Sequence, residues 1–283
     1  MEMKPHKPDR NILVILGGHD FDASGFHRLL DRALWRDRGL SWTGVEFPAA
    51  EDLLRPELVR KYDAVLFYDM AGVDFSQEGA VFLHAPSAAL MANMEALLEA
   101  GTPMLFLHHA SGSWPKNERY AQIVGGCYLL ERTMRGGRAV LESGFNGDVT
   151  HRLTPVIDHP IVEGLEEGFE IRDEVFMQHV YEDDIIPVMR SSYAATRDNF
   201  YSPLNYLKGK PNSNEGWHPA DGSDVAVWIK REKNSPIVYI QPGHGPSAYD
   251  NPNYRRLLGN AVAWLTSAEA KAFARQGQKA PAG

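Results

Sequence analysis

The feature that most constrains the fold is the recurrence, along the chain, of short apolar runs, the first of them rich in β-branched residues. Such runs occupy residues 11–16, 63–68, 103–107 and 237–240, and each has the length of one buried strand. Between the early runs, apolar residues recur at helical spacing, most clearly in residues 87–100. Strands that alternate with helices are typical of βαβ units. The sequence therefore predicts an α/β fold with a mostly parallel sheet and helices on both faces.

Capping residues and apolar patterns set the expected ends of the first and last helices. Ser24 stands where a helix N-cap is expected, and Gly39 supplies a C-terminal stop. Residues 253–265 carry an apolar side at helical spacing, which predicts an amphipathic helix. The tail from Ala268 onward is rich in Ala, Lys and Gln, and we expect it to fray.

The middle of the chain has a different pattern. Residues 128–189 hold several short β-like runs, which predict a β-rich excursion inserted in the sheet or extending it. Residues 191–224 form a long polar loop, and a loop of this length is typical of a lid, a subunit contact or a disordered segment. There is no internal repeat or linker. We therefore expect one domain over residues 1–267, followed by a tail over residues 268–283.

The charge balance and the apolar pattern exclude several partners. Lys and Arg total 29 against 37 for Asp and Glu, a formal net charge of −8, which argues against nucleic acid and against anionic membranes. No segment approaches the ~18 to 20 uninterrupted apolar residues of a membrane helix. The first ten residues are polar and hold no signal-peptide core. A cytoplasmic protein is expected.

Cysteine chemistry is also restricted, because the chain holds a single cysteine, Cys127, beside 11 histidines. One thiol forms no internal disulfide and no cysteine-rich metal site. We expect Cys127 to be buried and inert. Imidazoles and carboxylates are the groups expected to do any chemistry.

Histidines and a carboxylate follow four of the predicted strands. His19 follows the first run, Asp69 the second, His108 and His109 the third, and His244 the last. Ligands of open α/β sheets bind beyond the carboxyl ends of the strands. Neighbouring side chains on an extended chain point to opposite sides, so only one of His108 and His109 is expected to face the crevice. We predict that His19, His109 and His244 share a pocket.

Two kinds of chemistry suit these side chains, and the residues alone leave both open. Imidazoles with a carboxylate hold Zn²⁺ or a similar divalent ion, and a neutral imidazole also acts as a general acid or base. Glu174, next to Asp173, could complete a metal shell or belong to a solvated acidic turn, and His179 lies nearby. The ring of Trp114 or Tyr120 could stack on a sugar, although aromatic side chains more often serve packing.

Nucleotide and serine chemistry lack their motifs. There is no GxGxxG and no Walker A sequence, so no nucleotide cofactor is expected. Ser111 lies in His-Ala-Ser-Gly, which does not match GxSxG, and it is a poor candidate for a nucleophile.

Several longer runs resemble one known family. They read ILVILGGHDF, YDAVLFYDM, GTPMLFLHHASGSWPKNERYAQIVGG, DHPIVEGL with DEVF, and PIVYIQPGHGPSAYDNPNYRRLLGNAVAWL. In this order they resemble the ThuA-like (trehalose utilisation) family over most of residues 11–265, apart from residues 191–224. The resemblance implies a flavodoxin-like three-layer fold related to class I glutamine amidotransferases. Those enzymes carry a nucleophilic Cys after the strand matching residues 103–107, where this chain has His108 and His109, so glutaminase activity is not expected.

The resemblance also implies site residues and a substrate class. It carries over His19, His109, Glu174 and His244, and more weakly Asp69 and Trp114. The family is associated with catabolism of trehalose and related disaccharides, alongside dehydrogenases that make 3-keto sugars. The expected function is therefore a sugar-catabolic enzyme for keto-sugars or 3-keto-glycosides, acting by proton abstraction followed by elimination and hydrolysis or by isomerisation.

The expected roles are as follows. Catalysis falls to His109, His244 and Glu174. Zinc or manganese, if the metal chemistry applies, is held by His19, His109 and His244. Substrate contacts come from Asp69, Trp114, Tyr120 and His179. The expected partner is a small carbohydrate, and the long loop makes a homo-oligomer conceivable.

Two other functions compete with this one. The chain could be a non-catalytic, sugar-responsive binding protein that kept the fold without the Cys nucleophile. It could also be a hydrolase of another type that activates water with the His and carboxylate groups. Histidines that point apart would favour the binding protein, and activity on unoxidised glycosides or amides would favour the hydrolase.

Overall fold

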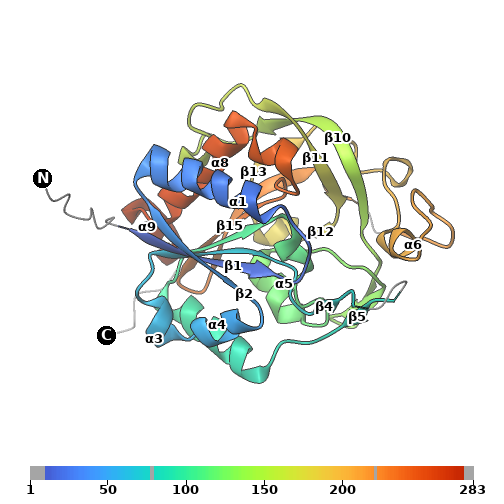
Figure 1. The fold of residues 1–283 in the computed structure, drawn as a ribbon, viewed down its shortest axis with the longest axis horizontal. Coiled ribbons are helices and arrows are strands. Elements are labelled where there is room, and N and C mark those ends of the chain that lie inside the picture. Colours follow the sequence, from blue (N-terminus) through green and yellow to red (C-terminus); the bar gives the residue numbers. More distant parts are fainter. Residues whose placement is uncertain (1–9, 77–79, 220–221, 277–283) are drawn as a thin grey trace, which may run out of the picture.

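A nine-stranded sheet runs through the whole molecule (Figure 1). The computed structural model describes residues 10–76, 80–219 and 222–276. The strand order is β11-β10-β13-β14-β15-β6-β3-β1-β2. One half of the sheet is parallel and the other half is antiparallel, and the two halves meet at β15.

The parallel half confirms the predicted α/β fold. The four predicted apolar runs and one further predicted strand form its five strands: β1 (Asn11–Gly17), β2 (Ser41–Glu46), β3 (Ala64–Asp69), β6 (Met104–Leu107) and β15 (Ser235–Ile240). In chain order these strands lie 2-1-3-4-5 across the sheet, which is the flavodoxin-like arrangement.

The β-rich excursion extends the same sheet by antiparallel pairing. Its strands are β10 (Gly144–Pro155), β11 (Phe169–Met177) and β13 (Ile186–Ser191), and β14 (Val225–Glu232) joins them to β15. Three small two-stranded pairs lie outside the main sheet. They are β4 (Val73–Asp74) with β5 (Phe82–Leu83), β7 (Gly126–Cys127) with β12 (His179–Val180), and β8 (Thr133–Arg135) with β9 (Arg138–Val140).

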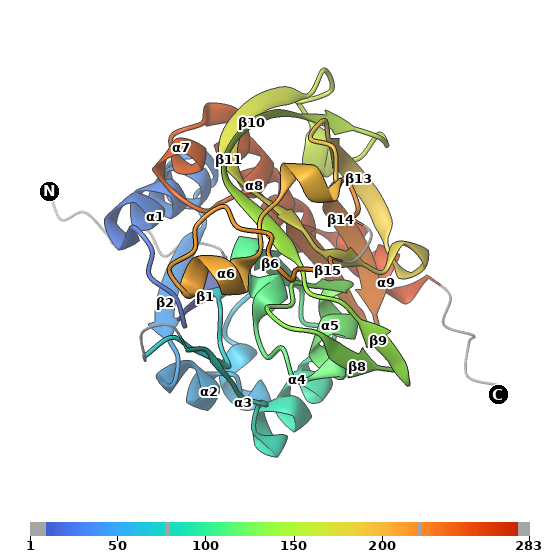
Figure 2. The same ribbon diagram turned by 90° about the vertical axis from the view of Figure 1, so that its right-hand side faces the viewer.

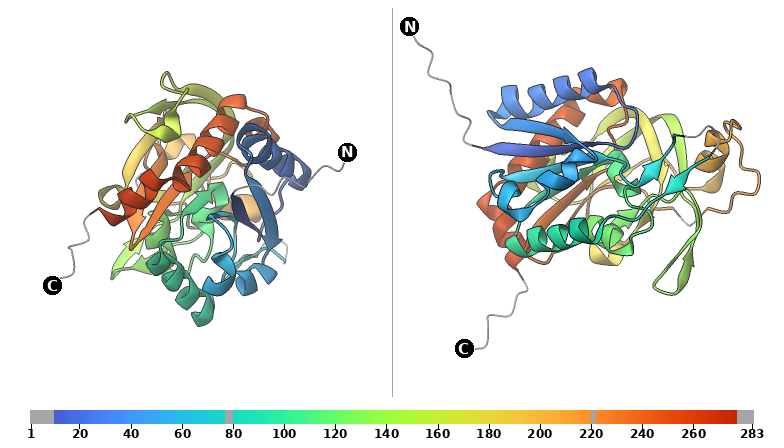
Figure 3. Two further views of the ribbon diagram at one scale, coloured as in Figure 1. Left: turned by 90° about the vertical axis from the view of Figure 1, so that its left-hand side faces the viewer. Right: turned by 60° about the horizontal axis from the view of Figure 1, so that its bottom comes forward.

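Helices cover both faces of the parallel strands (Figures 1 and 3). On one face, Ile12 and Val14 of β1 pack in a core with α1 (Ala23–Leu30), α8 (Pro252–Leu265) and α9 (Ala268–Arg275). On the other face, Leu13 and Ile15 pack with α2 (Ala49–Leu53), α3 (Pro56–Val59), α4 (Ala88–Ala100) and α5 (Glu118–Val124). The alternation follows from the two-residue period of a strand. No helix within the described ranges combines the length and apolarity needed to cross a membrane.

Two expected helix boundaries are wrong. The N-cap of α1 is Asp22, not Ser24, because the Asp22 carboxylate accepts the backbone N–H of Gly25 at 2.9 Å. The tail does not fray as far as Arg275, because α9 begins at the cap Ser267 and buries Ala270 and Ala274. Residues 277–283 of the predicted tail lie outside the described residues.

The long loop over residues 191–224 is packed against the sheet. It contains a 3₁₀ turn at Arg197–Asn199 and the short helix α6 (Pro203–Leu207), which Ser202 caps. Phe200 and Trp217 bury their side chains in one cluster with residues of β10 and β11. Residues 220 and 221 of the predicted loop lie outside the described residues. The remaining helical elements are a π-helical turn at Asp31–Arg36, 3₁₀ turns at His108–Gly112, Pro160–Val162 and Glu182–Asp184, and α7 (Pro246–Tyr249).

A buried amide offers a test of how α8 is held. The Nδ2 group of Asn260 donates to the carbonyl oxygens of Ile161 and Glu163 at 3.1 and 2.9 Å. We expect Asn260→Ala to lower the free energy of unfolding by about 2 kcal/mol, because these two hydrogen bonds are lost together with the one that Asn260 Oδ1 accepts from Arg38. Urea denaturation measures this. The matched control is Gln122→Ala on the exposed side of α5, and an equal loss in both variants would contradict the prediction.

Candidate active site

Four side chains converge beyond the carboxyl ends of the central strands, and we call them the imidazole cluster. The cluster consists of His108, His109, Glu174 and His244, and it offers one ligand atom from each within 4.8 Å of the others. The Oε2 atom of Glu174 lies 3.0 Å from His108 Nε2, 3.1 Å from His244 Nδ1 and 3.7 Å from His109 Nε2. One carboxylate oxygen is therefore surrounded by three imidazole nitrogens.

The turn after β6 brings both of its histidines into the cluster. His108 has a φ of 46°, so the extended chain ends there and a 3₁₀ turn begins. Only His109 lines the pocket beside the cluster, whereas the side chain of His108 is buried, so the expectation that one of the two faces the crevice is confirmed. His108 is a functional candidate that sequence reasoning missed, and its signal was the sharp turn after the strand.

The tautomer of His108 follows from its second contact. Its Nδ1 lies 2.6 Å from the carbonyl oxygen of Gln241, which accepts but does not donate. Nδ1 therefore carries the proton, and in the neutral ring Nε2 turns a lone pair toward Glu174. A lone pair that faces a carboxylate at 3.0 Å requires a proton or a cation between the two. Ligation through one nitrogen while the other donates to a carbonyl is common in metal-binding histidines.

Glu174 lies on β11, where it is buried, so the acidic-turn interpretation is wrong. Burial disfavours the charged carboxylate, but hydrogen bonds with His108 and His244 outweigh it and lower the pKa of Glu174 to about 2. For His244, burial opposes protonation while the contact with Glu174 favours it, and its pKa is raised. Glu174 is therefore an anion at neutral pH.

His19 lies beside the cluster. Its ring centroid is 4.3 Å from that of His109, and its Nδ1 lies 3.0 Å from the carbonyl oxygen of Asp20. Burial is the main cause that lowers the pKa of His19 to about 4, and burial with the neighbouring His108 holds the pKa of His109 well below its usual range. Both rings are neutral at pH 7, and His19 Nε2 is buried without a hydrogen-bond partner among the described residues.

The turn that brings His19 close to the imidazole cluster requires a glycine at position 18. Gly18 has a φ of 81°, and a Cβ atom there would lie 2.4 Å from the carbonyl oxygen of Met70. Only glycine fits this turn without moving the backbone after β3. The turn signal of residues 17 and 18 therefore also sets the position of His19.

The loop that carries His244 is fixed by buried polar groups. The Asp173 carboxylate accepts the N–H of Gly243 at 2.6 Å and that of His244 at 3.3 Å. The hydroxyl of Tyr68 donates to the Gly243 carbonyl at 2.9 Å, and that of Tyr254 donates to the Pro242 carbonyl at 2.9 Å. These contacts hold the imidazole of His244 against Glu174.

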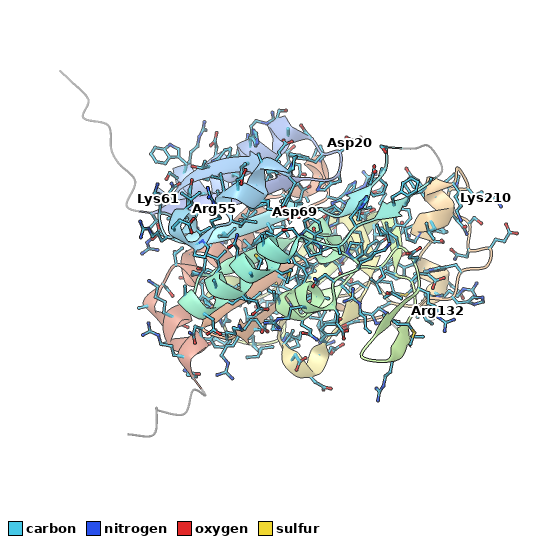
Figure 4. All side chains as sticks on the ribbon, turned by 90° about the horizontal axis from the view of Figure 1, so that it is seen from below. Asp20, Arg55, Lys61, Asp69, Arg132 and Lys210 are labelled. Atoms are coloured by element: carbon cyan, nitrogen blue, oxygen red, sulfur yellow. The ribbon has the colours of Figure 1, made fainter. Side chains whose placement is uncertain are left out.

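The cluster opens into a pocket of about 170 Å³, which we call the strand-end pocket. His19, His109 and His244 all line it, as do Asp20 and Glu174 on the same side. Figure 4 shows Asp20 and Asp69 midway between the Arg55 and Lys61 end of the molecule and the end that carries Arg132 and Lys210. The structure thus brings together the three histidines that sequence analysis placed in one pocket.

The other expected substrate contacts lie elsewhere. Asp69 is the last residue of β3 and points to the face opposite Tyr68, where it lines a cavity of about 10 Å³ with Trp114 and Tyr120. That volume holds about one water molecule and no sugar. His179 lies on β12, where its Nε2 is 3.3 Å from the Leu141 carbonyl oxygen, and it lines a separate surface depression.

The two remaining candidates for nucleophiles are buried. Ser111 Oγ donates to Gln178 Oε1 at 2.7 Å, below the floor of the site. Cys127 is buried on β7, and burial raises the pKa of its thiol. Neither residue lines the strand-end pocket.

Comparisons with known proteins agree with this fold. A ThuA-like protein from Parabacteroides merdae has a TM-score of 0.62 and 14% identity, over 96% of this chain and 93% of that one. A second, from Bacteroides uniformis, has a TM-score of 0.59 and 14% identity, over 93% and 94%. A β-galactosidase from Rahnella sp. R3 has a TM-score of 0.52 and 9% identity, over 89% of this chain but 30% of that one. At such identities the likeness shows the fold alone.

Comparison of the sequence with family models identifies the family as well as the fold. A family model described as ThuA, trehalose utilisation, matches residues 17–265. This range includes residues 191–224, which sequence analysis had left outside the resemblance. A search of curated proteins found no match.

The buried carboxyl of Asp69 predicts a pH dependence of stability. Burial raises its pKa from 3.8 to about 7. Between these values the folded state holds a proton that the unfolded state has lost, so the free energy of unfolding falls as pH rises. We expect Asp69→Asn to abolish this decrease in the free energy of unfolding, which is on the order of 4 kcal/mol in the wild type. Urea denaturation from pH 4 to 8 measures it.

The control for this prediction is Tyr120→Phe, which changes the same cavity but keeps the carboxyl. It should retain the pH slope of the wild type. If Asp69→Asn and the wild type lose stability in parallel as pH rises, Asp69 does not titrate as described.

Proposed function

The chain belongs to the ThuA family, described by trehalose utilisation, and we propose that it is a metal-dependent enzyme that removes a proton next to the carbonyl of a keto-sugar. Family membership points to a sugar-related role. The observation that carries the proposal is the convergence of three imidazole nitrogens on one oxygen of Glu174.

Distances within the imidazole cluster support a divalent ion as its occupant. Atoms bonded to one ion at ~2.1 Å lie ~3.0 to 3.4 Å from one another in octahedral or tetrahedral geometry. Glu174 Oε2, His108 Nε2 and His244 Nδ1 are 3.0, 3.1 and 3.2 Å apart. His109 Nε2 supplies a fourth ligand at 3.7 Å from the carboxylate oxygen. Three imidazoles and one carboxylate suit zinc or manganese.

The electrostatics of the cluster support the same occupant. Glu174 is charged and buried, and the lowered pKa of His109 leaves its ring neutral. The Gln241 carbonyl fixes His108 with its Nε2 lone pair toward the centre. Such an arrangement is prepared for a cation before the cation binds. The chemistry that a divalent ion would supply is polarisation of the ketone oxygen and stabilisation of the enolate charge.

His19 is the residue that we assign as the base. It lines the same pocket and is not one of the four proposed ligands. Its Nδ1–H donates to the Asp20 carbonyl, which leaves the lone pair on Nε2 to accept a proton. A buried nitrogen without a partner is expected to find one when a ligand fills the pocket.

The proposed reaction begins at C2 of a 3-keto-glycoside. The ketone at C3 acidifies the C2–H bond, His19 takes the proton, and the electron pair forms the enolate. The enolate then expels the C1 oxygen substituent, which takes the proton from His19 as it leaves. Alternatively the enolate is protonated at C3 while the C2 hydroxyl loses its proton, which moves the carbonyl from C3 to C2. Both outcomes use the same groups, and the first consumes water in a later addition.

The ligand set leads to a metal-binding prediction. We expect the purified chain to bind one equivalent of zinc or manganese, and His108→Ala to weaken binding by about 100-fold or more because a ligand is lost. Calorimetry and elemental analysis measure this. The exposed His218 supplies the control His218→Ala, which should bind like the wild type. Equal binding by His108→Ala and the control would remove His108 from the ligand set.

The base assignment leads to an exchange prediction. In D₂O, the metal-loaded wild type should exchange the C2 proton of a 3-keto-glucoside. The exchange rate of His19→Ala should be lower by a factor of about 100 or more. The metal content of His19→Ala should equal that of the wild type. Loss of metal in this variant would make His19 a ligand instead, and unchanged exchange would exclude it as the base. Absence of exchange in the wild type would overturn the proposed function.

A further inference from the structure

Two kinds of side chain line the strand-end pocket. Its charged and imidazole groups are the cluster residues His109, Glu174 and His244, with His19 next to His109, and Asp20. The rest of its described lining is apolar or aromatic: Met70, Phe75, Tyr128, Leu130, Phe145, Phe176, Pro203, Tyr206 and Leu207. The two phenol hydroxyls are the only polar side-chain groups in that part of the described lining. Phe176 lies beside the imidazole cluster, because its ring stacks on that of His108 with centroids 4.4 Å apart. We call the side of the pocket lined by Phe145 and α6 its apolar end, and the side lined by the imidazole cluster its polar end.

The apolar end presents large side chains to solvent. Tyr206 on α6 is 53% exposed and Phe75 after β4 is 37% exposed. The rings of Phe145 and Tyr206 meet edge to face, with centroids 5.3 Å apart. Exposed aromatic side chains gathered around a pocket are typical of a surface that takes an apolar ligand.

The wall formed by α6 is held in place. The backbones of Phe145 and Tyr201 exchange two hydrogen bonds, at 2.9 and 3.1 Å. The Nδ2 group of Asn205 donates to the carbonyl oxygens of Ser213 and Glu215 at 3.2 and 3.0 Å. Figure 2 faces the side of the molecule that carries α6, and it shows α6 in front of β1 and β6. The aromatic surface is thus a fixed part of the pocket.

We propose that the substrate is a 3-keto-glycoside whose C1 substituent is apolar or aromatic, with Tyr206 and Leu207 selecting that substituent. This inference rests on the proposed function and names its substrate class. The oxidised ring would lie at the polar end, where its oxygens meet His19 and the imidazole cluster. The substituent would lie against α6, where burial of apolar surface favours it.

A disaccharide fits this pocket less well. Its second ring carries hydroxyl groups around its whole edge, and each needs a hydrogen-bond partner when it leaves water. The apolar end provides few such partners among its described side chains. A phenyl or alkyl group needs none, and it also avoids the loss of hydration that a sugar hydroxyl suffers there.

Turnover by the full chain, loaded with zinc or manganese, tests the selectivity. We expect kcat/KM for phenyl 3-keto-glucoside to exceed that for 3-keto-trehalose by about tenfold or more. Tyr206→Ser and Leu207→Ser should each lower the phenyl value by about tenfold, chiefly through KM, and so reduce the ratio of the phenyl value to the 3-keto-trehalose value toward one. Phe82, which is 43% exposed and does not line the pocket, gives the control Phe82→Ser.

Binding of unreactive probes separates this inference from the proposed function. Calorimetry should show phenyl glucoside binding that Tyr206→Ser weakens by about tenfold, with weaker trehalose binding that the variant changes less. If neither keto-glycoside reacts but this pattern of binding appears, the proposed function fails and the selectivity stands. If 3-keto-trehalose reacts as well as the phenyl compound, or phenyl glucoside binding does not depend on Tyr206, the selectivity is overturned while the proposed function stands.

Discussion

The structure depends on a buried carboxylate that has to be neutralised. Glu174 is charged and almost removed from water, and three imidazole nitrogens surround one of its oxygens. An isolated charge at such a place would be costly, so its surroundings have to be arranged to compensate for it. The Gln241 carbonyl orients His108, and Asp173 holds the loop of His244. Much of the polar network beyond the central strands serves this one group.

The same carboxylate requires the sheet to curl. Three strands separate β11 from β15 in the sheet order. With neighbouring strands ~4.8 Å apart, a flat sheet would hold them ~19 Å apart. Glu174 on β11 nevertheless contacts His244, which follows β15, at 3.1 Å. Twist, together with the register shift between Asn146 and Val149 on β10, brings the far edge back over the parallel strands, as the arch of β10 and β11 in Figure 2 shows.

The fold was largely predictable because apolar periodicity reports strands and helices locally, and the carboxyl ends of parallel strands meet at one edge. That rule brought His19 and His244 together. It failed for Asp69, whose direction is set by the pleat of β3 rather than by its place at the strand end. It also missed His108, because a φ of 46° is a property of the turn that no apolar pattern reports. The burial of Glu174 depends on the curl of the sheet, so the residues alone left that carboxylate open between a metal ligand and a solvated acidic turn.

The segment over residues 191–224 shares no residue with the imidazole cluster, yet it supplies one wall of the strand-end pocket. The reacting groups stand on the sheet and its turns, whereas Pro203, Tyr206 and Leu207 stand on a loop that packs against β10 and β11. Mutations in that loop can therefore accumulate without disturbing the arrangement of the histidines. Substitutions in the loop can therefore change which ligands the pocket accepts during evolution. The imidazole cluster, which needs residues from several strands and turns, stays the same.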